Sequence, residues 1–239
     1  MNNPSNGTDR PGNVFNEKLF SLLAHDLKNT FNTVISISQY LSTGIDSMPR
    51  EELDEYLSVI RKTSTDMNMT LENFISLNRI KSGSTVKPSV RINPYPAIIN
   101  IASDMTAMYK ASGKLVDVVF FGNEDMTIGM DELSFSLVIR NILSNAFKFS
   151  DDNGKIVIHA SEEEGKAVIS VSDEGCGMTA EDVDNFNKGI PFSKPGTTGE
   201  KGTGLGLMLC REILDMYGGR IGFDCGQEKG CCVRVEVGG

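Results

Sequence analysis

Apolar residues in the first third of the chain recur at intervals of three and four, the spacing of one face of an α-helix. Over residues 15–41 this stripe consists of Leu19, Leu23, Leu27, Thr30, Val34, Ile37 and Leu41. A polar connector with Gly44 and Pro49 follows, and then a second stripe of Leu53, Leu57, Ile60, Ser64, Met67, Leu71, Phe74 and Asn78. The pattern therefore predicts two long helices joined by a short loop.

These two helices predict a hairpin over residues 15–84 whose apolar faces need a further partner. The second stripe alternates strictly between steps of four and three, which is a heptad seam. Two helices alone cannot bury two such stripes, whereas a second copy of the chain completes a four-helix bundle. We therefore expect a homodimer through the hairpin; the alternative is a hairpin packed on its own following domain. Residues 1–14 show no periodic apolar pattern and are expected to form a flexible tail or linker.

From residue 85 onward, shorter helical patterns mix with strand-like alternation. Helices are expected over 95–110, 132–149 and 204–217, and strands over 115–121, 126–130, 155–161, 166–173, 220–224 and 231–237, after an edge strand and turn in 87–96. The strands on either side of "EEEG" are expected to pair as a hairpin. The predicted fold class is α+β: a helical hairpin followed by an α/β sandwich with helices on one face of a mixed sheet.

Composition narrows the classes of partner. The net charge of the 239 residues is −9, of which −7 lies after Ser84, so nucleic-acid binding is not expected. No run approaches the roughly eighteen apolar residues that cross a bilayer, and no membrane contact is expected for this chain. The five cysteines have no ligand-like spacing, which favours a reducing cytoplasm and small buried or half-buried side chains. A polyanionic ligand in the acidic part would need a metal ion, helix amino ends and local lysines.

His25 is placed differently from a core histidine. It lies two residues after Leu23, about 200° around the helix, which puts it nearly opposite the apolar stripe. Its neighbours on that face, Ser21, Lys28 and Asn29, are polar. The pattern therefore predicts a solvent-facing imidazole that is available for chemistry.

The stretch "RNILSNAFKFS" contains a polar face on a predicted helix. Asn141, Asn145 and Lys148 follow each other at steps of four and three, so they share that face. The carbonyl of Asn145 suits a hydrated Mg²⁺ ion, and Lys148 offers a point charge for phosphate oxygens. Polar stripes on helices are more often simply solvated, so this feature alone is weak.

The stretch "VSDEGCGM" places a carboxylate at the end of a predicted strand. Asp173 is followed by Gly175 and Gly177, which allow close approach of the backbone. A carboxylate in this position can accept a hydrogen bond from the exocyclic amine of adenine. Taken alone, the pattern is also that of a common turn.

The stretch "GEKGTGLGL" puts Gly202, Gly204 and Gly206 at the start of a predicted helix, whose amide groups and dipole attract phosphate. The spacing fits neither a Rossmann nor a Walker motif. The preceding residues 178–201 form an unusually long connection that is either disordered or a lid. Phe186, Phe192 and the lysines Lys188, Lys194 and Lys201 favour a lid over a bound anion.

In combination, "HDLKN", "NILSNAFKF", "DEGCG" and "GTGLG" closely resemble the boxes of bacterial sensor histidine kinases, and the resemblance covers residues 15–239. It implies a dimerisation and histidine phosphotransfer hairpin over 15–84 and a catalytic ATP-binding domain over 85–239, with the sandwich shared by Hsp90 and gyrase. The implied activity is ATP-dependent phosphorylation of His25, transfer to an aspartate of a response regulator receiver domain, and phosphatase activity toward that regulator. The implied location is the cytoplasm, either free or as the core of a membrane-anchored sensor.

The resemblance assigns roles residue by residue. His25 matches the phosphoacceptor, Asp26 the adjacent acid that orients or deprotonates it, and Asn29 the position that places water for dephosphorylation. For the cofactors ATP and Mg²⁺, Asn145 matches the metal ligand, Lys148 a phosphate contact, Phe149 the aromatic near adenine and Asp173 the adenine-amine acceptor. The other implied nucleotide-binding residues are Asn141, Gly175, Gly177, Lys201, Gly202, Thr203, Gly204, Leu205 and Gly206.

One position departs from the family pattern: Thr30 stands where a proline often follows the histidine, which puts switching between kinase and phosphatase states in doubt. Two other functions compete with the kinase. A silent scaffold that dimerises and docks a regulator would not need intact nucleotide boxes. A serine kinase or other ATPase of the same sandwich would not need the hairpin that carries His25.

Overall fold

The computed structural model describes residues 11–44, 47–81, 90–190, 192–194, 196–197, 204–224 and 229–238. In α1 and α2 a number of side chains, His25 and Asp26 among them, lie outside the described set. The chain divides into two compact units, Met1–Ile75 and Ser76–Gly239, and each is described by itself.

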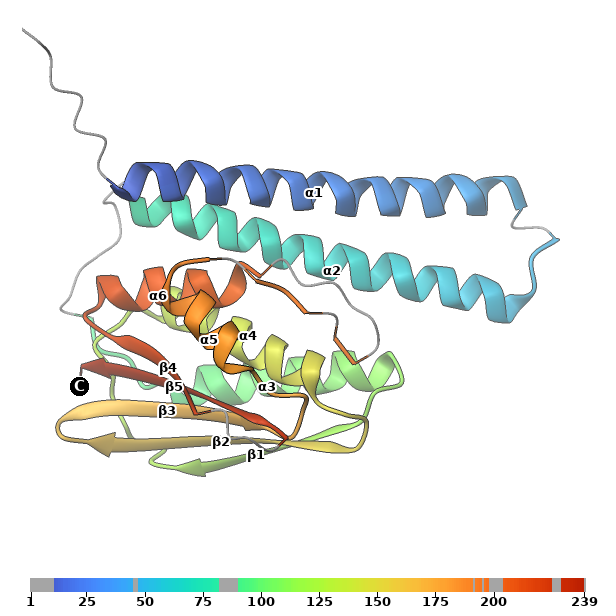
Figure 1. Ribbon diagram of the computed structural model, residues 1–239. Coiled ribbons are helices and arrows are strands. Elements are labelled where there is room, and N and C mark those ends of the chain that lie inside the picture. The colour runs from blue at the N-terminus through green and yellow to red at the C-terminus, as the bar shows by residue number, and fades with distance from the viewer. Residues whose placement is uncertain are drawn as a thin grey trace, which may run out of the picture. The chain divides into compact units, whose positions relative to one another are not determined.

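The first unit contains two long helices, α1 (Pro11–Gly44) and most of α2 (Arg50–Lys81) (Figure 1). Helix α1 begins at Pro11, four residues before the predicted Phe15, so residues 11–14 belong to the helix and not to the expected tail. Proline is well tolerated in the first turn of a helix. The rings of Tyr40 and Tyr56 meet near the connector, with centroids 5.2 Å apart. The predicted hairpin is therefore present, and α1 continues through Thr30 as one helix.

The apolar stripes are only partly covered within one chain. In α1 the predicted stripe is the covered side, since Leu27, Thr30, Val34 and Ile37 are half-buried and Leu41 is buried. In α2 the seam divides into two rows of heptad spacing: Leu53, Ile60 and Met67 are half-buried, whereas Leu57, Ser64 and Leu71 are exposed. Phe31 and Ile35 are exposed as well. Among the described residues, a single hairpin thus covers the apolar stripe of α1 and one of the two rows of the α2 seam.

The second unit is built on a five-stranded mixed sheet in the order β1-β2-β3-β5-β4. Its strands are β1 (Val116–Gly122), β2 (Gly154–Glu163), β3 (Lys166–Asp173), β4 (Arg220–Asp224) and β5 (Cys231–Gly238). Strand β1 pairs parallel with β2, and the other neighbours are antiparallel. The predicted β2–β3 hairpin is confirmed, and its turn places Glu164 and Gly165 at positive φ, which suits a two-residue hairpin loop.

Three helices cover one face of this sheet, namely α3 (Tyr95–Ala111), α4 (Glu132–Phe149) and α6 (Gly206–Met216) (Figure 1). Their inward side chains meet alternate strand residues in a core that includes Ile98, Phe135, Ile142, Leu143, Ile156, Ile158 and Ile213. The α+β class and the one-sided covering of a mixed sheet are as predicted. Helix α4 matches its predicted limits because Asp131 caps it, accepting a hydrogen bond from the Ser134 amide at 3.0 Å.

Three predicted elements are wrong. The edge strand expected in 87–96 is not formed by the described residues 90–96, of which Ile92 makes a single bridge and Tyr95 starts α3. Residues 126–130 do not form a strand; Ile128 makes only an isolated bridge with Ile92, so the alternating pattern there reflects buried side chains without a continuous ladder. Part of the predicted lid is a helix, α5 (Ala180–Asn187). It starts with a capping box formed by Thr179 and Asp182, a T-x-x-D pattern that is readable in the sequence.

The cysteines differ from expectation in two places. Cys210 is buried and Cys232 is half-buried, but Cys176 is exposed. Cys231 forms a disulfide, so the expectation of reduced cysteines is wrong at this position. Within the ranges that the structure describes, no helix is both long and apolar enough to span a membrane.

Candidate functional site

The C-terminal half of α4 carries three of the predicted nucleotide-binding residues. Asn145, Lys148 and Phe149 lie on its last turns and are half-buried. The Lys148 ammonium lies 4.8 Å from the centroid of the Phe149 ring and donates a hydrogen bond to the Lys194 carbonyl at 3.3 Å. A cation and an aromatic ring are therefore held beside each other at the end of this helix.

Asn141, one turn earlier, is placed differently. It is 5% exposed, and its amide donates to the Leu137 carbonyl at 2.8 Å. A Cβ added to Gly206 would lie 2.7 Å from Asn141 Oδ1, so the first turn of α6 rests directly on this side chain. Asn141 therefore links α4 to the start of α6 from within the core.

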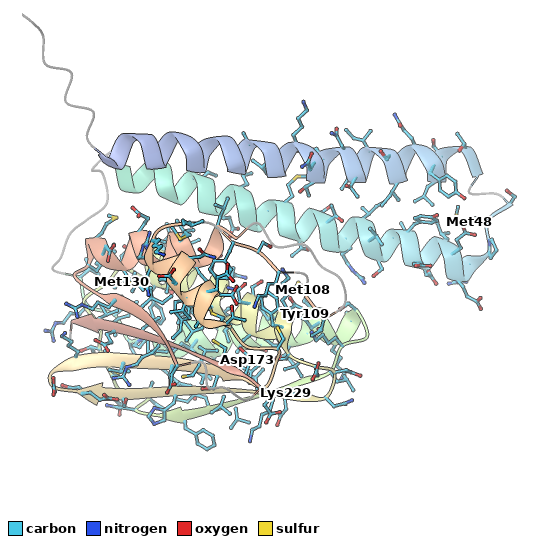
Figure 2. All side chains as sticks on the ribbon, in the orientation of Figure 1. Met48, Met108, Tyr109, Met130, Asp173 and Lys229 are labelled. Carbon is cyan, nitrogen blue, oxygen red and sulfur yellow. The ribbon has the colours of Figure 1, made fainter. Side chains whose placement is uncertain are left out.

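Asp173 ends β3, as the sequence predicts, and lies next to the end of α4 (Figure 2). Burial raises the pKa of its carboxyl from 3.8 to about 6, although hydrogen bonds from the amides of Gly175 and Cys231 act in the opposite direction. The Gly175 amide donates to Asp173 Oδ1 at 2.9 Å. A Cβ on Gly175 would lie only 2.1 Å from the Phe149 carbonyl oxygen, so only glycine lets β3 and α4 approach this closely.

The second glycine box is described from Gly204 onward. Gly204 has φ +70° and packs against the backbone of Phe192, where a Cβ would lie 2.3 Å from the Phe192 carbonyl oxygen. Leu205 is buried and Gly206 opens α6. Lys201, Gly202 and Thr203 lie outside the described residues.

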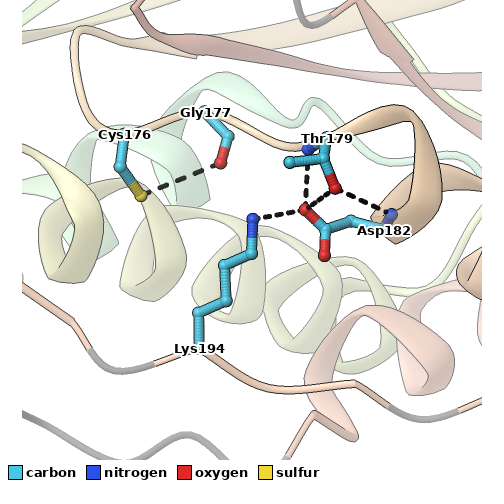
Figure 3. Close-up of polar contacts among 5 residues, drawn as sticks. All are labelled: Cys176, Gly177, Thr179, Asp182 and Lys194. Carbon is cyan, nitrogen blue, oxygen red and sulfur yellow. Dashed lines mark hydrogen bonds and ion pairs between the residues drawn. The ribbon is translucent and has the colours of Figure 1, made fainter.

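The segment after α5 is tied to α5 by an ion pair. The Lys194 ammonium contacts the Asp182 carboxylate, which also accepts from the Thr179 amide at 2.6 Å and the Thr179 hydroxyl at 2.7 Å (Figure 3). Burial opposes ionisation of Asp182, but its bonds with Lys194 and Thr179 lower its pKa overall. Residues 192–194 are thus anchored to the first turn of α5.

Phe186 corrects the predicted lid. It is 2% exposed and packs edge-on against Phe223 with centroids 4.8 Å apart, while the Arg211 guanidinium lies over its ring. This side chain belongs to the core and is not a lid residue. Lys188, another predicted lid lysine, pairs with Asp184 at the surface at 2.5 Å.

Lys114 was not singled out by the sequence pattern. It is 6% exposed, and its ammonium donates to the Phe147 carbonyl at 2.6 Å, the Thr197 hydroxyl at 2.8 Å and the Lys148 carbonyl at 3.3 Å. A lysine between a turn and a strand looks like an ordinary surface residue in sequence. Its three partners identify it as a cation at the C-terminal end of α4.

The predicted phosphoacceptor and its neighbours belong to the first unit. His25 and Asp26 lie within α1, and their side chains are outside the described residues. Asn29 is exposed and its carbonyl accepts from the Thr33 hydroxyl at 3.1 Å.

Helix α4 thus gathers the separate motifs of the second unit. Its Asn141 contacts the start of α6, and its last turn contacts Gly175, Lys194 and Thr197. The assembled groups are a carboxylate acceptor, an amide oxygen, an ammonium and a helix amino end. Such a set can bind an adenine amine at one end and phosphate oxygens at the other.

The comparisons with known proteins agree with this arrangement. Residues 130–238 match the family described as histidine kinase-, DNA gyrase B-, and HSP90-like ATPase, so the second unit has the fold of these ATPases. The sensor histidine kinase WalK of Bacillus subtilis is 28% identical over 227 residues, covering 90% of this chain and 35% of WalK. The catalytic domain of histidine kinase ThkA superposes with TM-score 0.53 at 26% identity, covering 62% of this chain and 94% of that domain.

A further solved structure covers both units. Histidine kinase ThkA in complex with the response regulator protein TrrA superposes with TM-score 0.62 at 21% identity, covering 92% of this chain and 60% of that one. In the family match, the relatives and the superpositions together, the chain is similar to sensor histidine kinases, and its second unit has the fold of their ATPase domain. It spans between 35% and 42% of the length of the first curated relatives that it matches.

Proposed function

We propose that the chain is an ATP-dependent protein histidine kinase core, with a phosphotransfer hairpin over residues 15–84 and a catalytic domain over 85–239. The observation that carries this proposal is that Asp173 and the start of α6 both lie beside α4, the helix that carries Lys148. An ATPase fold without a phosphoacceptor would not account for the hairpin, and a silent scaffold would not account for the assembled nucleotide groups.

ATP is proposed to lie along the end of α4. The ionised Asp173 accepts a hydrogen bond from the adenine amine, and the half-buried ring of Phe149 lies beside the base. Lys148 neutralises phosphate charge, and the amide groups from Lys201 to Gly206 bind phosphate oxygens at the start of α6. Gly177 and Gly175 allow the backbone to approach, while the buried Asn141 holds Gly206 in place and need not touch ATP.

The donors in this region also fit a nucleotide-bound metal ion. Mg²⁺ usually takes one or two protein oxygens and completes its shell with phosphate and water. Across the parts of the chain that the structure describes, no group of three or more His, Cys, Asp or Glu side chains is arranged to hold a metal. We assign Asn145 as the protein ligand because its half-buried carboxamide lies about one turn before Lys148 on α4; when bound, the ion would neutralise charge on the phosphates.

His25 is the proposed nucleophile. A neutral ring nitrogen forms a bond to the γ-phosphorus while the bond to the β–γ bridging oxygen breaks, and ADP leaves. An ordinary histidine pKa near 6.5 keeps this neutral form abundant at cellular pH. Asp26 orients the ring or accepts its proton, and Asn29 positions water when the regulator is dephosphorylated.

The phosphoryl group is proposed to pass to an aspartate of a response regulator receiver domain. The similar structure of histidine kinase ThkA in complex with the response regulator protein TrrA supports this class of partner. We also propose a cytoplasmic location, no nucleic-acid partner, and a homodimer formed by the hairpin. The exposed row Leu57, Ser64 and Leu71 supports the dimer. It is the half of the heptad seam that a single hairpin leaves exposed and that a second hairpin could cover.

Labelling with γ-phosphate-labelled ATP and Mg²⁺ tests the kinase. We expect a label that is stable to alkali and lost in acid, as for a phosphohistidine, and no label in His25→Ala. A label that persists in His25→Ala would refute the assignment. Asn145→Ala should abolish labelling through loss of Mg·ATP binding, whereas Asn29→Ala should label normally and slow dephosphorylation of the regulator.

Sedimentation equilibrium tests the dimer. Leu71 is 43% exposed in the single chain, so Leu71→Glu should leave the hairpin folded and shift the protein to a monomer. Glu72→Gln, at the neighbouring exposed position, is the matched control and should remain dimeric. A dimeric Leu71→Glu protein would contradict the proposed seam.

A further inference from the structure

The C-terminal end of α4 is completed by residues from two distant segments. Ala146 accepts bonds from both the amide and the hydroxyl of Ser150, at 3.0 and 2.7 Å. The next two carbonyls, of Phe147 and Lys148, lie in the last turn of α4, where no amide of the helix reaches them, so they need partners from elsewhere. Those partners are Lys114, which precedes β1, and Thr197, which follows α5.

Lys114 is a buried cation directed at the negative end of a helix. At 6% exposure, burial of its ammonium is tolerated only because three oxygens surround it. The ammonium also lies 5.9 Å from the centroid of the Tyr109 ring, which stacks on Phe147 with centroids 4.8 Å apart. The ammonium is therefore held in one place by the core.

Thr197 connects this cation to the segment that follows α5. Its amide donates to the Lys148 carbonyl at 3.2 Å, and its hydroxyl oxygen lies 2.8 Å from the Lys114 ammonium. The same hydroxyl has the carbonyls of Lys148 and Ser150 within 3.1 and 3.0 Å as acceptors. Lys114 and Thr197 thus bind the same helix end and each other.

We propose that Lys114 and Thr197 form a positioning pair that sets the affinity for ATP without touching the nucleotide. The last turn that they hold carries Lys148 and Phe149, whose side chains are the proposed phosphate and adenine contacts. Together with the bond from Lys148 to the Lys194 carbonyl, the pair also connects residues 192–194 and 196–197 to α4. This inference rests on the proposed function, because the affected quantity is the affinity for ATP.

The effect should fall on binding more than on turnover. The pair lies in the second unit, remote in sequence from the phosphoacceptor His25, so a variant saturated with ATP retains all groups of the transfer step. Loss of one hydrogen bond to a charged group corresponds to a change of about tenfold in affinity. We expect Lys114→Met to raise the Kd and KM for Mg·ATP about tenfold and to change kcat by less than about threefold.

Thr197 provides the variant that spares the fold. Thr197 is exposed, so Thr197→Val removes the hydroxyl without opening a cavity in the core. It should weaken ATP binding in the same direction, and Thr197→Ser, which keeps the hydroxyl, should restore it. Because the two residues contact each other and the same helix end, the loss of affinity in the double variant should be smaller than the sum of the two single losses.

Two matched controls separate this effect from general destabilisation. Lys110→Met removes an exposed lysine from the last turn of α3, and Thr106→Val removes a hydroxyl that bonds within α3 at 2.8 Å. Both should bind ATP as the wild type does. Equal weakening in the controls, or Kd values within twofold of wild type for Lys114→Met and Thr197→Val, would overturn the proposal.

Hydrogen exchange gives a readout that does not depend on ATP. The Thr197 amide, bonded to the Lys148 carbonyl, should exchange faster in Lys114→Met than in the wild type or in Lys110→Met. Unchanged exchange would overturn the positioning pair. A wild-type protein that fails to bind Mg·ATP, but shows the faster exchange in Lys114→Met, would instead refute the proposed function.

Discussion

Asp173→Asn should stabilise the second unit while it removes ATP binding. The folded carboxyl keeps its proton up to a pKa of about 6, whereas the ordinary value is 3.8. Burial is the main cause of the raised value, and the amides of Gly175 and Cys231 offset only part of it. At neutral pH the folded protein must therefore keep a buried carboxylate charged, which costs folding free energy.

The sign and size of this cost follow from proton linkage. Between pH 3.8 and about 6 the folded state binds more protons than the unfolded state, so stability falls as pH rises and then levels off. A difference of about two units at 1.36 kcal/mol each sets an upper limit of roughly 3 kcal/mol. Asparagine cannot titrate, so the free energy of unfolding of Asp173→Asn relative to wild type should rise by up to that amount through the same pH range.

Urea unfolding, monitored by hydrogen exchange of the β3 and β5 amides, measures this difference in the free energy of unfolding directly for the sheet. Other carboxyls titrate in both proteins and cancel when the two curves are subtracted. Asp104→Asn, which removes an exposed carboxylate on α3, is the matched control for the loss of one charge. A flat difference for Asp173→Asn, or one that falls as pH rises, would refute the reasoning.

The same linkage predicts the pH dependence of ATP binding. The ionised carboxylate is a stronger acceptor for the adenine amine than the protonated carboxyl, so wild-type affinity should fall as the pH falls below about 6. Fluorescence titration with an ATP analogue that keeps the adenine amine would measure it. If the affinity for ATP does not change between pH 5 and 7, Asp173 does not bind the base.

Two further substitutions test the supports of the site. Gly175→Ala should lower stability by about 2 kcal/mol in thermal unfolding and abolish ATP binding, because its Cβ would lie 2.1 Å from the Phe149 carbonyl oxygen. Gly222→Ala is the control and should be neutral, because a Cβ there meets nothing within 4 Å. Tyr217→Phe removes the hydroxyl that bonds the α4 cap Asp131 and should cost about 1 kcal/mol at neutral pH. Although burial opposes it, bonding by Tyr217 lowers the pKa of Asp131, so the loss should be full above the ordinary value of 3.8 and should shrink as pH falls below it; a loss independent of pH would contradict this.

Short-range pattern was sufficient for most helices and strands of this chain. Helix α4 was predicted at its observed limits because its apolar spacing, its cap at Asp131 and the break after Phe149 are all local features. The β2–β3 hairpin follows equally from alternation on both sides of a glycine turn. Helix α5 was readable from its capping box at Thr179 but was hidden by the polar residues around it.

The candidate site divides in the same way. Asn145, Lys148 and Asp173 are predicted as site residues from spacing and box order, since residue type and periodicity already place polar groups on one helix face and at one strand end. The role of Asn141 as a buried support was not readable, because spacing shows a shared face and does not show what covers that face. Phe186 was wrongly assigned to a lid for the same reason.

What the sequence determined by itself was therefore the inventory of elements, the identity of the chemical groups and the order of the boxes, all of which depend on neighbours within a few residues. Only the tertiary structure decided which groups meet. Lys114 shows why: its partners Phe147 and Thr197 lie 33 and 83 residues away. Only the folded sheet and helices, which bury the ammonium where a helix end exposes its carbonyls, bring such distant residues within hydrogen-bonding distance.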